Sequence, residues 1–298
     1  FAWRPVAGAS RYEFEVLDRE GSVVYSANTG AVLRFTGTDA LTLARSLSGS
    51  RRNVSPDCVS PETFEQLRRG GFVVSKNKSE LFQIRRRYHR ARKETPMVLT
   101  LTTSMDCNLG CYYCYEERSS DRLKLQDVEA VINLARERLA RSRKRSIHVD
   151  WYGGEPLMNP EFIEAASLAL QAFCKTERIL YSASVISNGT CWPKDVGSFI
   201  KRHGIRQVQI SFDGLRENHN RRRRFRKGYK PSGDASSFDL AVALVDQLLN
   251  YTHVDIRLNI DGENQQDVMP FIDFARRRVA DAAGGHVLAV AGDVVSPA

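Results

Sequence analysis

The chain has 298 residues, enough for about two domains of roughly 100–200 residues each. Apolar residues make up 42% of it and charged residues 27%, and this composition excludes a disordered or fibrous protein. The most apolar run, 240–249, contains Asp246 and is too short to cross a membrane, so we expect a soluble, cytoplasmic protein with no membrane partner. The 44 lysines and arginines exceed the 35 aspartates and glutamates, and the net charge of +9 favours an acidic partner.

Residues 1–78 are expected to form a small α+β domain of the winged-helix type. Residues 12–17 alternate between polar and apolar side chains, as a half-buried strand does. Ser60 followed by Pro61 is typical of a helix start, and a pair of glycines at 70 and 71 is typical of a helix end. The predicted elements are strands over 12–17, 23–25 and 72–74, a helix over 38–47, and a helix from Pro61 to Gly70.

Residues 79–96 are expected to form a basic linker helix. Leu81, Ile84 and Tyr88 recur at helical spacing, and arginines occupy positions 85, 86, 87, 90 and 92. A run of charges is usually a solvated helix face, and we favour this interpretation over an RNA- or peptide-binding stripe. Only Tyr88 is an aromatic residue beside the stripe, whereas RNA binding needs several aromatic rings on which bases stack.

From residue 97 to residue 298, predicted strands and helices alternate. The strands cover 98–103, 147–152, 180–187, 207–212, 254–260 and 286–290. The helices cover 127–141, 194–201, 238–250 and 267–279, and a further helix begins at Asn159-Pro160. Repeated βα units predict a parallel sheet with right-handed crossovers. The expected fold class is therefore α/β, a partial (β/α)6 barrel over 97–298 preceded by the small α+β domain.

Alternation along the later strands predicts where a ligand lies. Helices must cover the apolar face of each strand, so the polar face is expected to line the barrel interior. Its polar residues include Gln209, Ser211, Asp213, Arg257, Asn259 and Asp261. A barrel filled by its own side chains needs bulky aliphatic residues inside. We therefore expect an open polar interior that holds a ligand.

Three of the six cysteines, Cys107, Cys111 and Cys114, lie in one octapeptide directly after the first strand of this series. Loops at the carboxyl ends of parallel strands are where active sites collect. Three thiolates suit three corners of an iron–sulfur cube and leave the fourth iron open to a ligand. A zinc ion held by these cysteines and an aspartate or histidine is the alternative. The remaining cysteines are scattered, at 58, 174 and 191, so we expect one four-iron cluster per chain.

The spacing Cys-x3-Cys-x-aromatic-Cys, with Tyr113 as the aromatic residue, resembles the radical S-adenosylmethionine superfamily. Motifs at the ends of later strands carry the same resemblance, which covers residues 97–298. They are Gly153-Gly154-Glu155-Pro156, Ser187-Asn188-Gly189-Thr190, and Ser211-Phe212-Asp213-Gly214 followed by Glu217, His219 and Arg223, together with Asn259 on the fifth strand.

The resemblance implies a [4Fe–4S] cluster on the three cysteines and a bound S-adenosylmethionine. In this family, one-electron reduction cleaves S-adenosylmethionine to a 5′-deoxyadenosyl radical, which abstracts a hydrogen atom from the substrate. Glu155 is expected to meet the methionine ammonium group, and Ser211 and Arg223 the ribose and the methionine carboxylate. The full set of expected cofactor-binding residues is Tyr113, Gly153, Gly154, Glu155, Pro156, Asn188, Ser211, Asp213, Arg223 and Asn259. No catalytic acid or base is identified.

Residues 9–117 resemble, within this superfamily, enzymes that modify peptides or proteins, such as maturases of ribosomally made natural products and of anaerobic sulfatases. The resemblance implies a peptide or protein substrate, a leader peptide captured by the N-terminal domain as an added β-strand, and an electron donor such as flavodoxin or ferredoxin. Such enzymes continue into a cysteine-rich domain with auxiliary clusters. We expect this chain to lack that domain, because no cysteine follows Cys191.

The alternative function is that of a non-catalytic zinc or iron–sulfur protein that binds RNA through its basic helix. The run 221–227 adds further positive charge. Most charge runs are solvated loops, and Arg223 in this run already has an expected cofactor role. We therefore expect no nucleic-acid partner.

Overall fold

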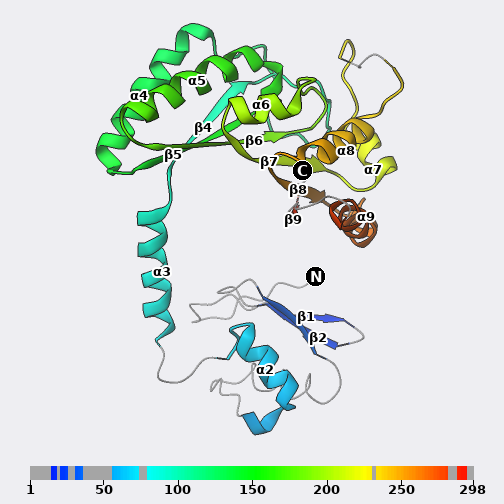
Figure 1. Cartoon of the computed structure of the whole chain (residues 1–298). Helices are drawn as coiled ribbons and strands as arrows, with labels where there is room; N and C mark the ends of the chain where they lie inside the picture. Colours follow the sequence, from blue (N-terminus) through cyan, green and yellow to red (C-terminus); the bar gives the residue numbers. More distant parts are fainter. Residues whose placement is uncertain are drawn as a thin grey trace. The chain divides into compact units, whose positions relative to one another are not determined.

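The computed structural model describes residues 15–18, 21–25, 31–35, 56–73, 79–229, 233–280 and 287–293. The chain divides into two compact units, residues 1–94 and residues 95–298 (Figure 1). Among the described residues, no helix is both long enough and apolar enough to cross a membrane.

In the first unit, the described strands form an antiparallel sheet in the order β1-β2-β3. These strands are β1 (Glu15–Asp18), β2 (Gly21–Tyr25) and β3 (Val32–Phe35). The predicted pairing of the first two strands is confirmed, with Asp18 opposite Gly21 at the turn. β3 is an additional strand, absent from the prediction. The helix predicted over 38–47 lies outside the described residues.

The helices of the first unit follow the sequence signals. A short 3-10 helix, η1 (Pro56–Cys58), precedes α2 (Pro61–Arg69). The side chain of Ser60 accepts a hydrogen bond from the backbone N–H of Thr63 at 3.2 Å, so α2 begins where predicted. Helix α3 (Glu80–Glu94) matches the expected linker helix.

The strand predicted over 72–74 is wrong where the structure describes it, at Phe72 and Val73. Their N–H groups donate to the carbonyl oxygen of Leu67 in α2, at 2.9 and 3.3 Å, instead of pairing with a strand. Gly71, with a φ of +71°, turns the chain back over the end of the helix. The two side chains therefore pack against the small core of this unit.

The second unit is built on a six-stranded parallel sheet in the order β4-β5-β6-β7-β8-β9. Its strands are β4 (Met97–Ser104), β5 (Ser146–Gly153), β6 (Leu180–Ser187), β7 (Ile205–Phe212), β8 (His253–Ile260) and β9 (Val287–Asp293). All six predicted strands are present, with ends shifted by a few residues. Because the strands lie side by side in chain order, the predicted partial barrel of βα units is confirmed.

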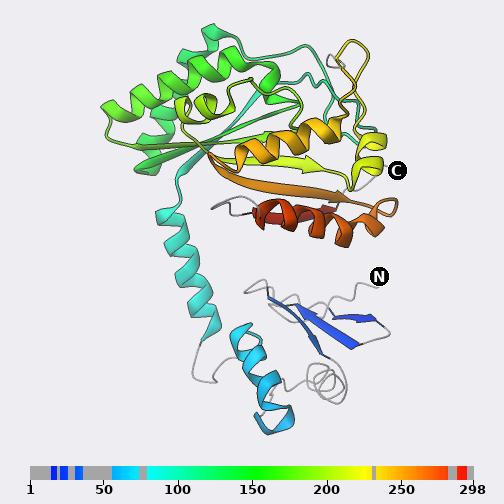
Figure 2. The same ribbon diagram turned by 45° about the vertical axis from the view of Figure 1, so that its right-hand side comes forward.

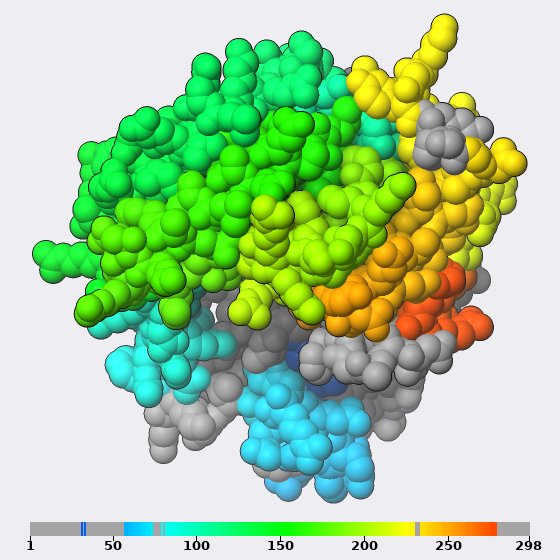
Figure 3. All heavy atoms as spheres, turned by 45° about the horizontal axis from the view of Figure 1, so that its top comes forward, coloured from blue at the N-terminus to red at the C-terminus, as the bar shows by residue number. Residues whose placement is uncertain are grey.

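The helices of this unit cover one face of the sheet. They are η2 (Leu125–Asp127), α4 (Val128–Ser142), η3 (Pro156–Met158), α5 (Pro160–Thr176), α6 (Val196–Arg202), α7 (Arg216–Arg222), α8 (Ser237–Leu248), η4 (Gln265–Asp267) and α9 (Val268–Ala280). Figures 1 and 2 show α4, α5, α6, α8 and α9 on the outside of the curved sheet. In Figure 3 the colours pass in chain order across this layer, from green to orange. Helix α7, which was not predicted, directly follows the carboxyl end of β7.

Side-chain burial confirms the predicted alternation on the strands. On β7, Val208, Ile210 and Phe212 are at most 1% exposed and belong to the main core. Gln209 and Ser211, between them, are only half-buried and face the other side. The polar side of the strands therefore lies on the face that the helices leave uncovered, which we call the open face.

Replacing Leu170 by alanine should destabilise the second unit by about 2–5 kcal/mol, because this α5 side chain is fully buried in the main core. Leu168 on the same helix is 40% exposed, and its replacement should change stability by only about 0.5 kcal/mol. Urea unfolding followed by circular dichroism measures both. Equal losses would contradict the orientation of α5.

Candidate functional site

The cysteine loop, residues 105–116, directly follows β4 and carries all three cysteines of the motif. Cys107 is buried, Cys111 is half-buried and Cys114 is exposed. The sulfur of Cys107 accepts hydrogen bonds from a backbone N–H of the loop at 3.4 Å and from the side-chain amide of Asn188 at 3.6 Å. Since Asn188 follows β6, the first cysteine is held between the ends of two strands.

The donor set of the loop fits an iron–sulfur cluster. Three thiols are the ligands that such a cluster takes. In the part of the chain that the structure describes, no three His, Cys, Asp or Glu side chains, these cysteines included, are already grouped as metal ligands. Burial, with the nearby charge of Glu155, raises the pKa of the Cys107 thiol to about 12. Burial also raises the pKa of Cys111, and the positive charge of Arg223 opposes that effect. Thiolates are stabilised by N–H donors on sulfur and by a nearby cation, and the loop offers both.

The arginine segment, residues 222–229, is hydrogen-bonded along the cysteine loop. The N–H of Gly110 donates to the carbonyl of Arg224 at 2.7 Å, and the N–H of Arg226 donates to the carbonyl of Asn108 at 3.0 Å. The guanidinium group of Arg226 also donates to the carbonyl of the first cysteine, at 2.7 Å. Charges that the sequence presents as one run therefore help to fix the loop.

Asp106 pairs with the arginine segment from inside the loop. Its carboxylate accepts hydrogen bonds from Arg226 at 2.5 Å and from the hydroxyl of Tyr229 at 2.7 Å. Burial opposes the ionisation of Asp106, but these two partners outweigh it, and the pKa of Asp106 lies below its ordinary value. The charge of Arg226 is thus matched by a carboxylate rather than left for a nucleic acid.

Gly153 and Gly154, expected to expose backbone to a ligand, lie against the start of the cysteine loop. A Cβ atom at Gly153 would overlap the carbonyl oxygen of Ser104, and one at Gly154 would stand 2.5 Å from that of Asp106. The N–H of Gly154 donates to the carbonyl of Ser104 at 2.9 Å. These glycines let the end of β5 close on the loop, and their contact with a cofactor stays a prediction.

Glu155, expected to meet an ammonium group, is fully buried. Its carboxylate accepts hydrogen bonds from the hydroxyl of Ser187 at 2.9 Å, from the N–H of Asn188 at 2.8 Å and from the N–H of Leu157 at 3.2 Å. Burial raises the pKa of Glu155 to about 7 against the effect of these donors. The carboxylate ties the glycine motif, which continues into Pro156 at the start of η3, to the end of β6. Its contact with an ammonium group stays a prediction.

Asn188 joins the turn after β6 to the cysteine loop. Its side-chain oxygen accepts a hydrogen bond from the N–H of Thr190 at 2.9 Å, and its amide donates to the side-chain oxygen of Asn108 at 2.9 Å. Asn108 in turn donates to the hydroxyl of Thr190 at 2.7 Å. Gly189, with a φ of +80°, permits the tight turn. The motif therefore positions the cysteine loop, and the contact of Asn188 with a cofactor stays a prediction.

The buried carboxylate of Asp213, just past β7, brings together the residues expected at the later strands. It accepts hydrogen bonds from Nε of Arg223 at 2.8 Å, from Nε of Arg222 at 3.2 Å and from the amide of Asn259 at 3.1 Å. Burial opposes ionisation of Asp213, but the charge and hydrogen bond of Arg223 outweigh burial, and the pKa of Asp213 lies below its ordinary value. Ser211 lies half-buried two residues before it, on the open face.

Tyr113 of the cysteine loop stacks on both arginines. Its ring centre lies 5.1 Å from the guanidinium carbon of Arg222 and 6.0 Å from that of Arg223. Burial raises the pKa of Tyr113, although the charge of Arg223 opposes this. The structure therefore brings Tyr113, Arg223, Asp213 and Asn259 together at one end of the sheet.

A model of the Radical SAM superfamily matches residues 101–275 of this chain. The matched range runs from β4 into α9 and includes the whole cysteine loop and the arginine segment. The chain belongs to the Radical SAM superfamily. The predicted cofactors, a [4Fe–4S] cluster and S-adenosylmethionine, are those of this family, and the family resemblance is confirmed.

Several enzymes are similar in sequence to this chain. Radical SAM cyclopropyl synthase TigE of Paramaledivibacter caminithermalis is 24% identical over 168 residues, covering 50% of this chain and 35% of TigE. A probable GTP 3′,8-cyclase of Methanocella arvoryzae is 28% identical, covering 60% of this chain and 52% of the cyclase. The serine-type anaerobic sulfatase-maturating enzyme of Klebsiella aerogenes is 27% identical, covering 53% of this chain and 38% of the enzyme.

A solved structure shows the shared fold. Native anSMEcpe with bound AdoMet and Kp18Cys peptide has a TM-score of 0.54 and 20% sequence identity, covering 68% of this chain and 52% of that chain. The chain thus spans between about a third and a half of the length of the proteins it resembles.

His219, part of the radical SAM pattern in the sequence, lies in the core rather than at the site. It is fully buried, with ring centres 5.3 Å from Phe212 and 5.5 Å from Phe238. Burial lowers the pKa of His219 to about 3, so the ring is neutral at physiological pH. Its contribution is packing between β7 and the helices that follow.

Sequence reasoning missed the contacts of four residues at this site. Asp106, Tyr112 and Arg222 were given no role, and Asp261 was expected on the open face without a partner. In the structure each is bound to an oppositely charged or hydrogen-bonding residue of another loop. The available signal was the coincidence of an arginine run with acidic residues at strand ends, which does not say which residues pair.

Replacing Gly154 by alanine should lower stability by about 1–3 kcal/mol and reduce iron uptake, because the new Cβ would push the carbonyl of Asp106 and the start of the cysteine loop away. Gly262 is the matched control, since a Cβ there meets nothing within 4 Å. Thermal unfolding and iron content after anaerobic reconstitution measure the effect. Normal iron content in Gly154→Ala would show that the close approach is not needed.

Proposed function

We propose that this chain uses S-adenosylmethionine, with a [4Fe–4S] cluster on Cys107, Cys111 and Cys114, to modify a peptide or protein by radical chemistry. The supporting observation is the cysteine loop, which is fixed against a buried group of arginine, aspartate and asparagine side chains at the carboxyl ends of β7 and β8. When bound, the cluster and S-adenosylmethionine supply an electron and a carbon-centred radical that removes a hydrogen atom from the substrate.

Arg223 is the residue that we propose for the methionine carboxylate. Its Nε is bound to Asp213 at 2.8 Å, whereas its terminal nitrogens make no hydrogen bond with the described residues. The guanidinium group is therefore oriented and still has donors for a carboxylate. Ser211 on the open face is proposed for the ribose. The other proposed contacts are Tyr113, Gly153, Gly154, Glu155, Pro156, Asn188, Asp213 and Asn259.

The open face supports a peptide substrate because it carries hydrogen-bonding side chains. Asp150 on β5 accepts a hydrogen bond from the hydroxyl of Ser184 at 2.5 Å, and Nε2 of His148 lies 3.2 Å from the same carboxylate. Nδ1 of His148 lies 2.8 Å from the hydroxyl of Ser182. Peptide amide groups need such partners when they leave water. The sulfatase-maturating relative and the peptide in the anSMEcpe structure support the same substrate class.

The proposal extends to partners of the first unit and of the cluster. The described antiparallel sheet has β1 and β3 at its edges, and an edge strand is where a leader peptide is added as a further strand. A flavodoxin or ferredoxin of the cytoplasm is the proposed electron donor.

Replacing Cys107, Cys111 and Cys114 together by alanine should remove both iron binding and S-adenosylmethionine cleavage, because the three thiols are the proposed cluster ligands. The wild type should bind about four irons per chain after anaerobic reconstitution and form 5′-deoxyadenosine when reduced. Cys58→Ala is the control, since Cys58 is exposed in the first unit. Formation of 5′-deoxyadenosine by the triple variant would refute the proposal.

The substrate class is tested with short peptides encoded beside the gene. Such a peptide should accelerate 5′-deoxyadenosine formation and show a mass change by mass spectrometry, because it occupies the open face. GTP serves as the competing substrate, given the similarity to a GTP 3′,8-cyclase. If GTP accelerates 5′-deoxyadenosine formation and is consumed, and no peptide changes in mass, the substrate is a nucleotide and the proposed peptide substrate is refuted.

A further inference from the structure

We propose that Arg222 is a positioning residue that fixes the cysteine loop against the ends of β7 and β8. This inference deepens the proposed function and rests on it. Arg222 is the last residue of α7, and its side chain is fully buried. A guanidinium group is costly to bury unless each of its nitrogen atoms has a partner, so the partners of Arg222 show what it does.

All three nitrogens of Arg222 donate to protein atoms, each in a different part of the chain. Nε donates to Asp213 at 3.2 Å, Nη1 to the hydroxyl of Tyr112 at 2.7 Å, and Nη2 to Asp261 at 2.6 Å. Asp213 follows β7, Asp261 follows β8, and Tyr112 belongs to the cysteine loop. One planar group therefore ties the loop to two strand ends.

Both aromatic residues between the second and third cysteines lie on this guanidinium group. The guanidinium carbon of Arg222 is 5.3 Å from the ring centre of Tyr112 and 5.1 Å from that of Tyr113. The hydroxyl of Tyr112 also donates to Glu263 at 3.2 Å, which holds the ring from the side of β8. The part of the loop between Cys111 and Cys114 thus takes its position from Arg222.

The neighbouring residues Arg222 and Arg223 use their guanidinium nitrogens differently. Arg223 engages Asp213 through Nε and keeps its terminal nitrogens free of hydrogen bonds with the described residues. Arg222 has no nitrogen without a protein partner. It therefore acts on the cluster and on S-adenosylmethionine only through other residues, which are the loop and Asp213. Lysine cannot replace it, because one ammonium group does not present three donors in a fixed plane.

The test uses Arg222→Lys and the metal-free protein. We expect iodoacetamide to alkylate the half-buried Cys111 about tenfold faster than in the wild type, since loss of a charge-assisted hydrogen bond changes an equilibrium by that order. Cys58 in the first unit is exposed, and its alkylation rate, followed by mass spectrometry in the same sample, should not change. An unchanged rate at Cys111 would overturn the proposal.

Two further variants keep the test decisive. Tyr112→Phe removes one hydroxyl from a residue that is 56% exposed, so it should fold and loosen the loop in the same direction to a smaller extent. Arg216→Gln, at the other end of α7, removes an ion pair with Asp239 and should leave the alkylation rate of Cys111 as in the wild type. Faster alkylation in Arg216→Gln as well would mean that α7 as a whole, and not Arg222, is responsible.

A spectroscopic readout links the loop to the cluster. After anaerobic reconstitution, Arg222→Lys should keep about four irons but show a shifted reduction potential and a changed electron paramagnetic resonance spectrum, because Cys111 and Cys114 are held differently. A wild-type chain without iron or S-adenosylmethionine cleavage would refute the proposed function. The alkylation result, measured without metal, would still decide whether Arg222 fixes the loop.

Discussion

A negative charge buried just past the end of β7 organises the cofactor end of the sheet. Asp213 is fully buried, and a buried carboxylate is unfavourable unless cations and hydrogen-bond donors surround it. Two arginines and Asn259 meet this requirement, and one of the arginines also reaches the cysteine loop. Compensation of the charge of Asp213 therefore sets the relative positions of β7, β8 and the cysteine loop.

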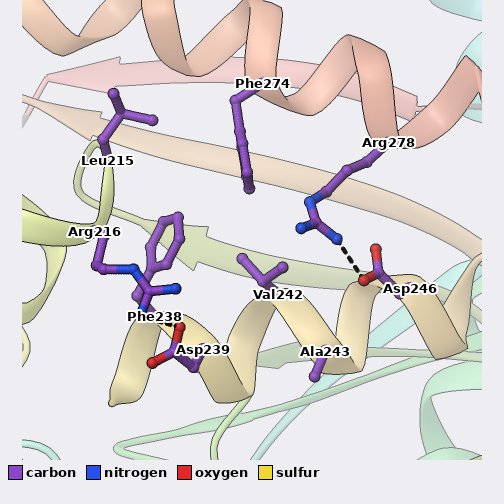
Figure 4. Close-up of a pocket in the computed structure, with 9 residues that line it drawn as sticks. All are labelled: Leu215, Arg216, Phe238, Asp239, Val242, Ala243, Asp246, Phe274 and Arg278. Atoms are coloured by element: carbon purple, nitrogen blue, oxygen red, sulfur yellow. Dashed lines mark hydrogen bonds and ion pairs between the residues drawn. The ribbon is translucent and has the colours of Figure 1, made fainter. Parts of the chain in front are cut away.

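The groove between α8 and α9 (Figure 4) lies on the helical layer, apart from these residues.

Most of the fold was predictable because its signals are local. Alternating side chains and helical spacing predict all six strands and five of the helices of the second unit, since burial on one face imposes those periods. The failures have local causes as well. Helix α7 has no apolar periodicity, because all of its residues are polar. Its position is set by hydrogen bonds to Asp213 and Asp267. The apolar residues Phe72 and Val73 resemble a strand but complete the end of a helix.

The site was predictable in its residues but not in its contacts. The cysteine loop, Asp213, Arg223 and Asn259 lie at neighbouring strand ends, because the strand ends of a parallel sheet meet, and their roles toward the cofactors stay predictions. Tyr112, one of the three hydrogen-bond partners of Arg222, lies 110 residues away in the sequence, and no periodicity connects the two residues. Gly154 illustrates the same limit. A glycine in the motif indicates that another group lies too close for a side chain, and only the structure shows that this group is the carbonyl of Asp106.

The exposed helix α3 changes how the basic character of the chain should be understood. Arg222, Arg223 and Arg226, beside the cysteine loop, are each paired with a carboxylate, so the charges in each pair largely cancel. On α3, by contrast, six basic residues stand against two acidic ones, and residues 81–94 are all exposed. Helix α3 therefore carries a net positive charge that is exposed to solvent. Raising the ionic strength will screen the charges on α3 while leaving the buried ion pairs around Asp213 almost unscreened.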